Sequence, residues 1–136
     1  MTNTRVLVLR HGQSEWNALG RWQGQANPPL TSLGIQQAAD AAGLLATECP
    51  HFDLVITSNL ERAHLTGQTI AQILGVPTVH VDNRWQENDA GEWQGLTPDE
   101  ISVQWPGYLE SGRRPPHFET EESTNQRVGA ALNNIA

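Results

Sequence analysis

Arg10 and His11 directly follow a run of apolar residues, Val6–Leu9, and directly precede Gly12. An imidazole changes its charge near neutral pH and can act as a base or a nucleophile, and a guanidinium fork matches the geometry of phosphate. The same residues could instead be structural, with the arginine at a strand end, the histidine packed and the glycine in a turn. Residues elsewhere in the chain decide between these two interpretations.

Two further polar groups follow apolar segments in the same way. Arg62 comes shortly after residues 52–58, and Glu87 comes shortly after residues 78–82. The carboxyl ends of parallel strands meet at one edge of a sheet, and ligands bind there. One such residue alone would most often be a solvated surface side chain. Two arginines, a histidine and a carboxylate at one predicted edge favour a functional site.

The elements expected to position these residues alternate along the chain. Segments rich in β-branched residues and leucine predict strands over residues 4–9, 52–58 and 78–82. The continuous apolar content of residues 4–9 is typical of a strand that is buried on both faces. The segments between the strands are long enough for helices, which requires parallel pairing. The pattern predicts an α/β fold.

Two helices are expected between these strands. The first has Thr31 as its N-cap, followed by apolar residues at helical spacing, namely Ile35, Ala38, Ala39, Ala42 and Leu45. The second begins with a capping box of Ser58 and Glu61 and ends before Gly75. Each helix is expected to pack one face on the sheet.

Length, charge and cysteine content limit the classes of function that the chain can have. The chain has 136 residues, which predicts a single domain over residues 1–136. A net charge of −7 argues against binding to nucleic acid or to an anionic membrane, so any anionic ligand needs a local cationic pocket. Cys49 is the only cysteine, which suits a reducing compartment and predicts a cytoplasmic protein. No apolar run approaches the roughly 20 residues of a membrane-spanning helix.

Four stretches occur together and in order: LRHGQSEWN, RWQGQANPPLTSLGIQQA, TSNLERAHLTGQTI and QENDAGEWQGLT. They resemble the successive motifs of the histidine phosphatase (phosphoglycerate mutase-like) superfamily, and in particular its broad phosphatase branch. The resemblance covers essentially the whole chain up to Gly95. It implies a three-layer α/β/α fold with a mostly parallel sheet.

The resemblance also implies a role for each matching residue. His11 is expected to attack phosphorus and to become transiently phosphorylated, and Arg10 and Arg62 are expected to stabilise the charge on the transferring phosphoryl group. Glu87 matches the residue that protonates the leaving alcohol. The residues expected to bind the substrate are Gly12, Asn17, Gln23 and Gly24. The expected partner is a phosphorylated small molecule, and no metal or organic cofactor is expected.

Three functions are compatible with these motifs. A phosphomonoester hydrolase is favoured, because the segment after the Glu87 motif begins with acidic residues and has only Arg113 and Arg114 late in it. A phosphoglycerate mutase would need more basic residues there to retain a second phosphorylated acid. A remnant with impaired catalysis that binds phosphorylated ligands or another chain is the third alternative.

One departure from the family pattern concerns a second histidine, which in the family binds the phosphate opposite the nucleophile. No matching motif occurs, and His117 lies among prolines without a preceding strand. Ser123 and Gln126 predict a capping box for a last helix, whose apolar stripe reaches Ile135. The domain is therefore expected to be incomplete at Ala136. An edge left open beside residues 4–9 could then form a homodimer.

Overall fold

The computed structural model describes residues 3–49 and 51–135, which include a small parallel sheet. Strands β1 (Val55–Thr57) and β2 (Val79–Val81) pair in parallel, with Val55 opposite Val79. Helix α3 (Glu61–Leu74) connects them and packs on both strands. The strands at 52–58 and 78–82, their parallel pairing and the intervening helix are therefore confirmed, although both strands are shorter than predicted.

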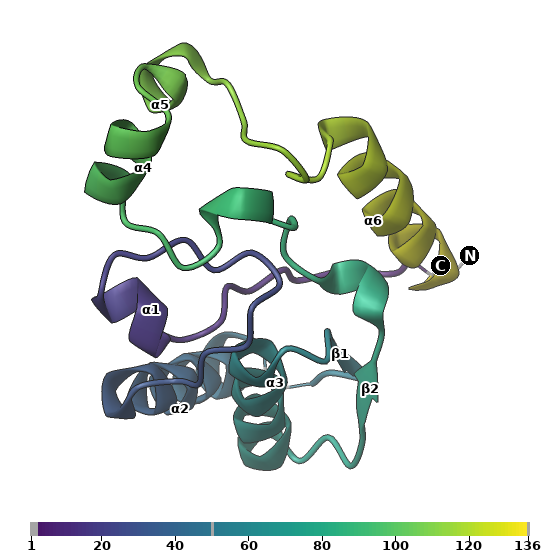
Figure 1. Cartoon of the computed structure of the whole chain (residues 1–136). Coiled ribbons are helices and arrows are strands. Elements are labelled where there is room, and N and C mark those ends of the chain that lie inside the picture. The colour runs from purple at the N-terminus through teal and green to yellow at the C-terminus, as the bar shows by residue number, and fades with distance from the viewer. Residues whose placement is uncertain (1–2, 50, 136) are drawn as a thin grey trace.

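Helix α2 (Ser32–Glu48) lies against α3 at one end of the molecule (Figure 1). Its predicted N-cap is confirmed, because the hydroxyl of Thr31 accepts a hydrogen bond from the amide of Gly34 at 3.0 Å. The buried face contains Gly34, Ala38 and Ala42. Ile35 is 46% exposed, so its assignment to the packed face was wrong. On that face Gly34 has to lack a side chain, because a Cβ there would overlap the backbone of Gln13.

Helix α3 begins differently from the prediction. The capping box of Ser58 and Glu61 does not form, because the N-cap is Leu60, which has no side-chain cap. Instead, the amide of Glu61 donates to the side-chain oxygen of Asn27 at 2.7 Å. The helix start thus depends on a distant loop, which local spacing cannot reveal. Its predicted end is confirmed, since Gly75 adopts the left-handed conformation with φ of 74°.

Residues 4–9 do not form the predicted strand. The segment runs across the molecule toward helix α1 (Glu15–Ala18) without a strand partner among the described residues (Figure 1). Val8 is 78% exposed and Leu7 is 54% exposed, so the expected burial on both faces is also absent. An apolar, β-branched segment favours a strand in a packed sheet. A strand forms only where a neighbouring strand provides amides and carbonyls for its backbone hydrogen bonds.

The second half of the chain lies above this helical base. It contains 3₁₀ turns η1 (Asn83–Trp85) and η2 (Gly91–Trp93), followed by helices α4 (Pro98–Gln104), α5 (Tyr108–Ser111) and α6 (Glu121–Ile135). In Figure 1, α4 and α5 stand apart from α6. Among residues 3–49 and 51–135, no helix combines the length and apolar composition that crossing a bilayer requires.

Helix α6 starts earlier than predicted. The amide of Ser123 donates to the hydroxyl of Thr120 at 3.1 Å, so Thr120 caps the first turn and the capping box of Ser123 and Gln126 is wrong. Both residues lie inside the helix. Ala131 is buried on the predicted apolar stripe, and Ile135 is half-buried. The predicted domain limit at Ala136 lies outside the described residues.

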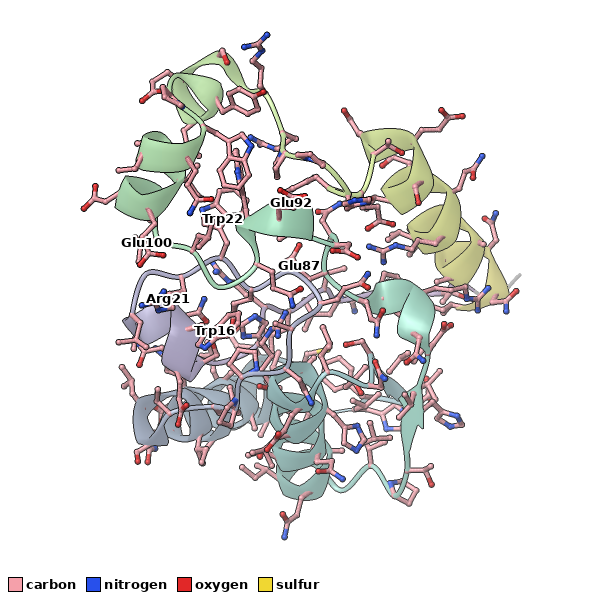
Figure 2. The ribbon with its side chains drawn as sticks, in the orientation of Figure 1. Trp16, Arg21, Trp22, Glu87, Glu92 and Glu100 are labelled. Atoms are coloured by element: carbon pink, nitrogen blue, oxygen red, sulfur yellow. The ribbon has the colours of Figure 1, made fainter. Side chains whose placement is uncertain are left out.

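Aromatic side chains join segments that are far apart in the sequence. The ring centroids of Trp22 and Trp93 are 5.1 Å apart, and those of Trp93 and Phe118 are 6.1 Å apart, all in edge-to-face contact. Arg21, next to Trp22, donates to the carbonyl of Gly95 at 2.6 Å (Figure 2). These contacts hold the loop after α1 against η2 and the turn before α6.

Candidate active site

His11 has one ring nitrogen fixed by the backbone. Its Nδ1 lies 2.6 Å from the carbonyl oxygen of Gly12, and because a carbonyl can only accept, Nδ1 carries the proton. The other nitrogen, Nε2, makes no hydrogen bond to the described residues and keeps its lone pair. The half-buried ring therefore presents one nucleophilic nitrogen in a defined tautomer.

Gly12 is held tightly from two sides. A Cβ at this position would overlap the backbone of Gly34 in α2, so the glycine is required by close packing of this turn on the helix. Its amide donates to the hydroxyl of Thr66 at 3.1 Å, and that hydroxyl donates to the carbonyl of Arg62 at 2.6 Å. Thr66 was missed in the sequence. Its position four residues after Arg62, on the same helical face, was the available signal.

Arg62 is the most deeply buried charged residue of the site, with only 1% of its surface exposed. Nη1 donates to the carbonyl of Ala26 and Nη2 donates to the carbonyl of Gly24, both at 2.6 Å. Burial lowers the pKa of Arg62, and the nearby Glu87 carboxylate acts in the opposite direction. A guanidinium has five N–H groups, and these two hydrogen bonds use one on each Nη of Arg62, which lines neither cavity described below.

The electrostatic environment of His11 favours the neutral imidazole. Burial is the largest cause that lowers its pKa below the usual 6.5, and the hydrogen bond to Gly12 acts against it. The positive charges of Arg62 and then Arg10 lower the pKa further, whereas the carboxylate of Glu87 raises it. The structure thus brings Arg10, Arg62 and Glu87 within electrostatic reach of His11.

Arg10 and Glu87 are the exposed members of this group. Arg10 lines a cavity of about 190 Å³ that His11, Gly12 and Thr66 also border. Glu87 accepts a hydrogen bond from the amide of Asn88 at 3.0 Å. Neither side chain is buried in a fixed pocket, so their positions depend on the backbone that carries them.

A second cavity, of about 180 Å³, opens beside Glu87. Figure 2 shows Trp22 and Glu87 in the central part of the molecule, and both line this cavity. The other lining residues are Gln23, Gly24, Asn88, Ala90 and Phe118. The cavity has aromatic and amide walls, which suit a molecule with both apolar and hydroxyl-bearing surfaces.

Three of the four predicted substrate-binding residues line these cavities: Gly12 borders the first, and Gln23 and Gly24 border the second, whereas Asn17 lines neither. Gln23 is buried and accepts a hydrogen bond from the hydroxyl of Ser14. Gly24 has a positive φ of 54°, and a Cβ there would overlap the backbone of Ala90. The side-chain oxygen of Asn17 accepts from the amide of Ser14 at 3.0 Å, so its amide nitrogen is left to donate.

The remaining histidines have other environments. His51 pairs with Asp53 at 2.9 Å on the surface, and His64 lies 3.1 Å from the hydroxyl of Thr57. His80 is exposed on β2. His117 is exposed in a turn with a positive φ of 64° and is not among the groups that shift the pKa of His11.

Known proteins are similar to this chain over most of its length. A glucosyl-3-phosphoglycerate phosphatase from Mycolicibacterium vanbaalenii is 39% identical over 117 residues, which cover 83% of this chain and 51% of the relative. A 2,3-bisphosphoglycerate-dependent phosphoglycerate mutase from Methylobacterium sp. is 39% identical over 104 residues, covering 74% of this chain and 50% of the mutase. The chain thus spans about half the length of these relatives.

A solved structure gives the same result for the fold. The mycobacterial glucosyl-3-phosphoglycerate phosphatase in complex with VO3 superimposes with a TM-score of 0.83 at 32% identity, covering 92% of this chain and 63% of that protein. This similarity confirms the α/β, phosphoglycerate mutase-like fold class. The family model described as histidine phosphatase superfamily (branch 1) matches residues 6–136. The chain therefore belongs to the histidine phosphatase superfamily.

Proposed function

We propose that the protein hydrolyses phosphate monoesters of small molecules through a phosphohistidine on His11. The observation that carries this proposal is the fixed tautomer of His11, whose Nδ1 proton is bound by the carbonyl of Gly12 while Nε2 stays free. Two arginines beside the ring favour its unprotonated form and also suit the phosphate anion. Glu87 supplies a carboxyl group at the same site.

The first half-reaction forms the phosphohistidine. The Nε2 lone pair of His11 attacks phosphorus, and the bond between phosphorus and the ester oxygen breaks. The protonated carboxyl group of Glu87 gives its proton to that oxygen, so an alcohol leaves. Arg62 and Arg10 stabilise the charge on the phosphoryl oxygens during the transfer, and the amide of Asn17 donates to one of them.

The second half-reaction returns the enzyme to its starting state. The carboxylate of Glu87 takes a proton from a water molecule, whose oxygen attacks phosphorus as the bond to Nε2 breaks. Inorganic phosphate leaves, and His11 is again neutral with its proton on Nδ1. The hydrogen bond from Nδ1 to Gly12 stabilises the positively polarised ring while it carries the phosphoryl group.

The alcohol part of the substrate fits the cavity beside Glu87. Its walls combine the faces of Trp22 and Phe118 with the amides of Gln23 and Asn88. Relatives named as glucosyl-3-phosphoglycerate phosphatases act, by their names, on a phosphorylated sugar acid. A phosphorylated small molecule with a hydroxyl-rich leaving group is therefore the proposed substrate class.

Hydrolysis is favoured over mutase-type transfer by the position of Arg113, one of the two late arginines. The guanidinium of Arg113 lies 5.1 Å from the ring centroid of Tyr108, and that of Arg114 lies 5.3 Å from the ring of Phe118. Within the described residues, neither arginine lines the two cavities. A mutase needs cations directed at a second phosphorylated acid. Arg113 is stacked on Tyr108, which lines neither cavity, whereas Arg114 stands over Trp22 and Phe118, so only Arg113 counts against a mutase.

The test is release of phosphate from p-nitrophenyl phosphate, with and without a chelator, because we expect no metal requirement. Wild type and a His51→Asn control should release phosphate at equal rates, since His51 is exposed and pairs only with Asp53. His11→Asn should abolish release. Binding of vanadate without turnover by the wild-type chain would support the remnant interpretation and overturn the proposal.

Three subsidiary expectations belong to this proposal. The net charge of −7 argues against nucleic acid and membrane surfaces as partners. A cytoplasmic location stays a prediction from the cysteine content. A homodimer formed through the exposed residues 6–9 also stays a prediction, and sedimentation velocity at several protein concentrations tests it.

A further inference from the structure

The segment that carries Glu87 is held by a side chain from the other end of the chain. Arg127, on α6, donates from Nη1 to the carbonyls of Arg84 at 2.8 Å and Gln86 at 2.6 Å. Its Nη2 also donates to the carbonyl of Glu87 itself, at 3.2 Å. One guanidinium thus binds three carbonyl groups along the four residues that lead to the predicted proton donor.

Arg127 is itself fixed by a carboxylate. Glu119 accepts from Nε at 2.7 Å and from Nη2 at 2.6 Å, in a two-pronged ion pair. The two side chains are only 18% and 11% exposed. The hydrogen bond from Arg127 is the main reason that the pKa of Glu119 falls to about 2, so the pair stays ionised at physiological pH. Glu119 also exchanges backbone and side-chain hydrogen bonds with Asp89.

Glu87 needs such external support because its own side chain has little. Its carboxylate is exposed, and its one hydrogen bond among the described residues comes from the adjacent amide of Asn88. After η1 the first bridge to another segment is at Ala90, opposite Phe118, and apart from Arg127 the described donor to the carbonyl of Glu87 is the side-chain amide of Gln25 at 3.2 Å. The position of the carboxyl group therefore follows from the backbone that Arg127 holds.

We propose that Arg127, oriented by Glu119, is a positioning residue that places Glu87 for proton transfer to the leaving alcohol. The proposal rests on the proposed phosphatase function. The ion pair of Arg127 and Glu119 lies outside both cavities, so it would affect catalysis through the position of Glu87 and not by touching the substrate. Lysine cannot replace this arginine, because one ammonium group cannot serve a carboxylate and three separate carbonyls.

The leaving group provides a readout that a purely structural role would not change. p-Nitrophenolate is a good leaving group and departs with little need for a proton, whereas an alkoxide needs the acid. The ratio of kcat/KM for glycerol phosphate to that for p-nitrophenyl phosphate therefore reports on Glu87. The ratio does not depend on the fraction of folded protein, because both values scale with the same enzyme concentration.

The experiment compares wild type, Arg127→Lys, Arg127→Met, Glu87→Gln and the control Arg113→Met, which changes an exposed arginine stacked on Tyr108. We expect both Arg127 variants to lower the ratio by about 10-fold or more, in the direction of Glu87→Gln, and the control to leave it unchanged. Equal losses on both substrates would overturn the positioning role while leaving the phosphatase function intact. A wild-type chain without His11-dependent turnover of p-nitrophenyl phosphate would overturn both proposals.

Discussion

Replacing Arg62 by methionine is expected to lower the free energy of unfolding as well as to weaken phosphate binding. The side chain is 1% exposed and donates hydrogen bonds at 2.6 Å to the carbonyls of Gly24 and Ala26. A hydrogen bond from a charged donor contributes about 1.5–3 kcal/mol, so the loss of two should cost about 3–6 kcal/mol. That is a large part of the 5–15 kcal/mol that is typical of a whole domain.

A lysine at the same position separates the two roles. Its ammonium group can reach one of the two carbonyls, so Arg62→Lys should cost about half as much, roughly 1.5–3 kcal/mol. Urea unfolding followed by tryptophan fluorescence measures both values, with Arg113→Met as the matched control. Added phosphate should stabilise wild type more than Arg62→Lys, because the lysine lacks the bidentate fork. A methionine variant within about 1 kcal/mol of wild type would refute the view that Arg62 holds the loop.

Three further predictions concern His11, the pH dependence of stability and Thr66. His11→Ala should abolish the acid-labile, base-stable phosphoryl label, and label on any other residue would exclude His11 as the nucleophile. Because burial lowers the pKa of His11 below 6.5 in the fold, the unfolded chain binds the proton more readily and stability should fall as pH drops below about 6.5. His11→Gln should weaken this pH dependence between pH 7.5 and 5, and an unchanged slope would contradict it. Thr66→Val should cost about 1–3 kcal/mol of stability by leaving the amide of Gly12 unpaired, and Thr66→Ser should restore most of it.

Features that depend on neighbouring residues were predictable from the sequence. Thr31 caps α2 because its hydroxyl reaches an amide three residues ahead, and Gly75 ends α3 because it tolerates a positive φ. The parallel pairing of β1 and β2 follows from the length of the helix between them. The approach of Arg62 and Glu87 follows from the same topology, because each comes shortly after one of the two paired strands, whereas the segment before His11 forms no strand.

Features that depend on distant partners were not predictable. Asn27 caps α3 in place of Ser58, and nothing in the spacing of either residue indicates this. Residues 4–9 have the composition of a buried strand but lie exposed, because composition does not provide a neighbouring strand. The sequence also did not indicate the ion pair of Glu119 and Arg127. Its main contacts are with backbone carbonyls of another segment, which residue types do not reveal.

In the irregular parts of the molecule, arginine side chains repeatedly donate hydrogen bonds to backbone carbonyls. Among the described residues, the loops around the site have only isolated bridges, at Ser14 and Leu30 and at Ala90 and Phe118, yet their buried carbonyls still need hydrogen-bond donors. Three arginines supply them: Arg21 donates to Gly95, Arg62 donates to two carbonyls of the loop before α2, and Arg127 donates to three carbonyls before and at Glu87. A guanidinium suits this task because its planar fork offers several donors in fixed directions. If Arg62 also binds phosphate, as proposed, then the same group that fixes this loop would hold the anion, and the anion site would form only when the loop is in place.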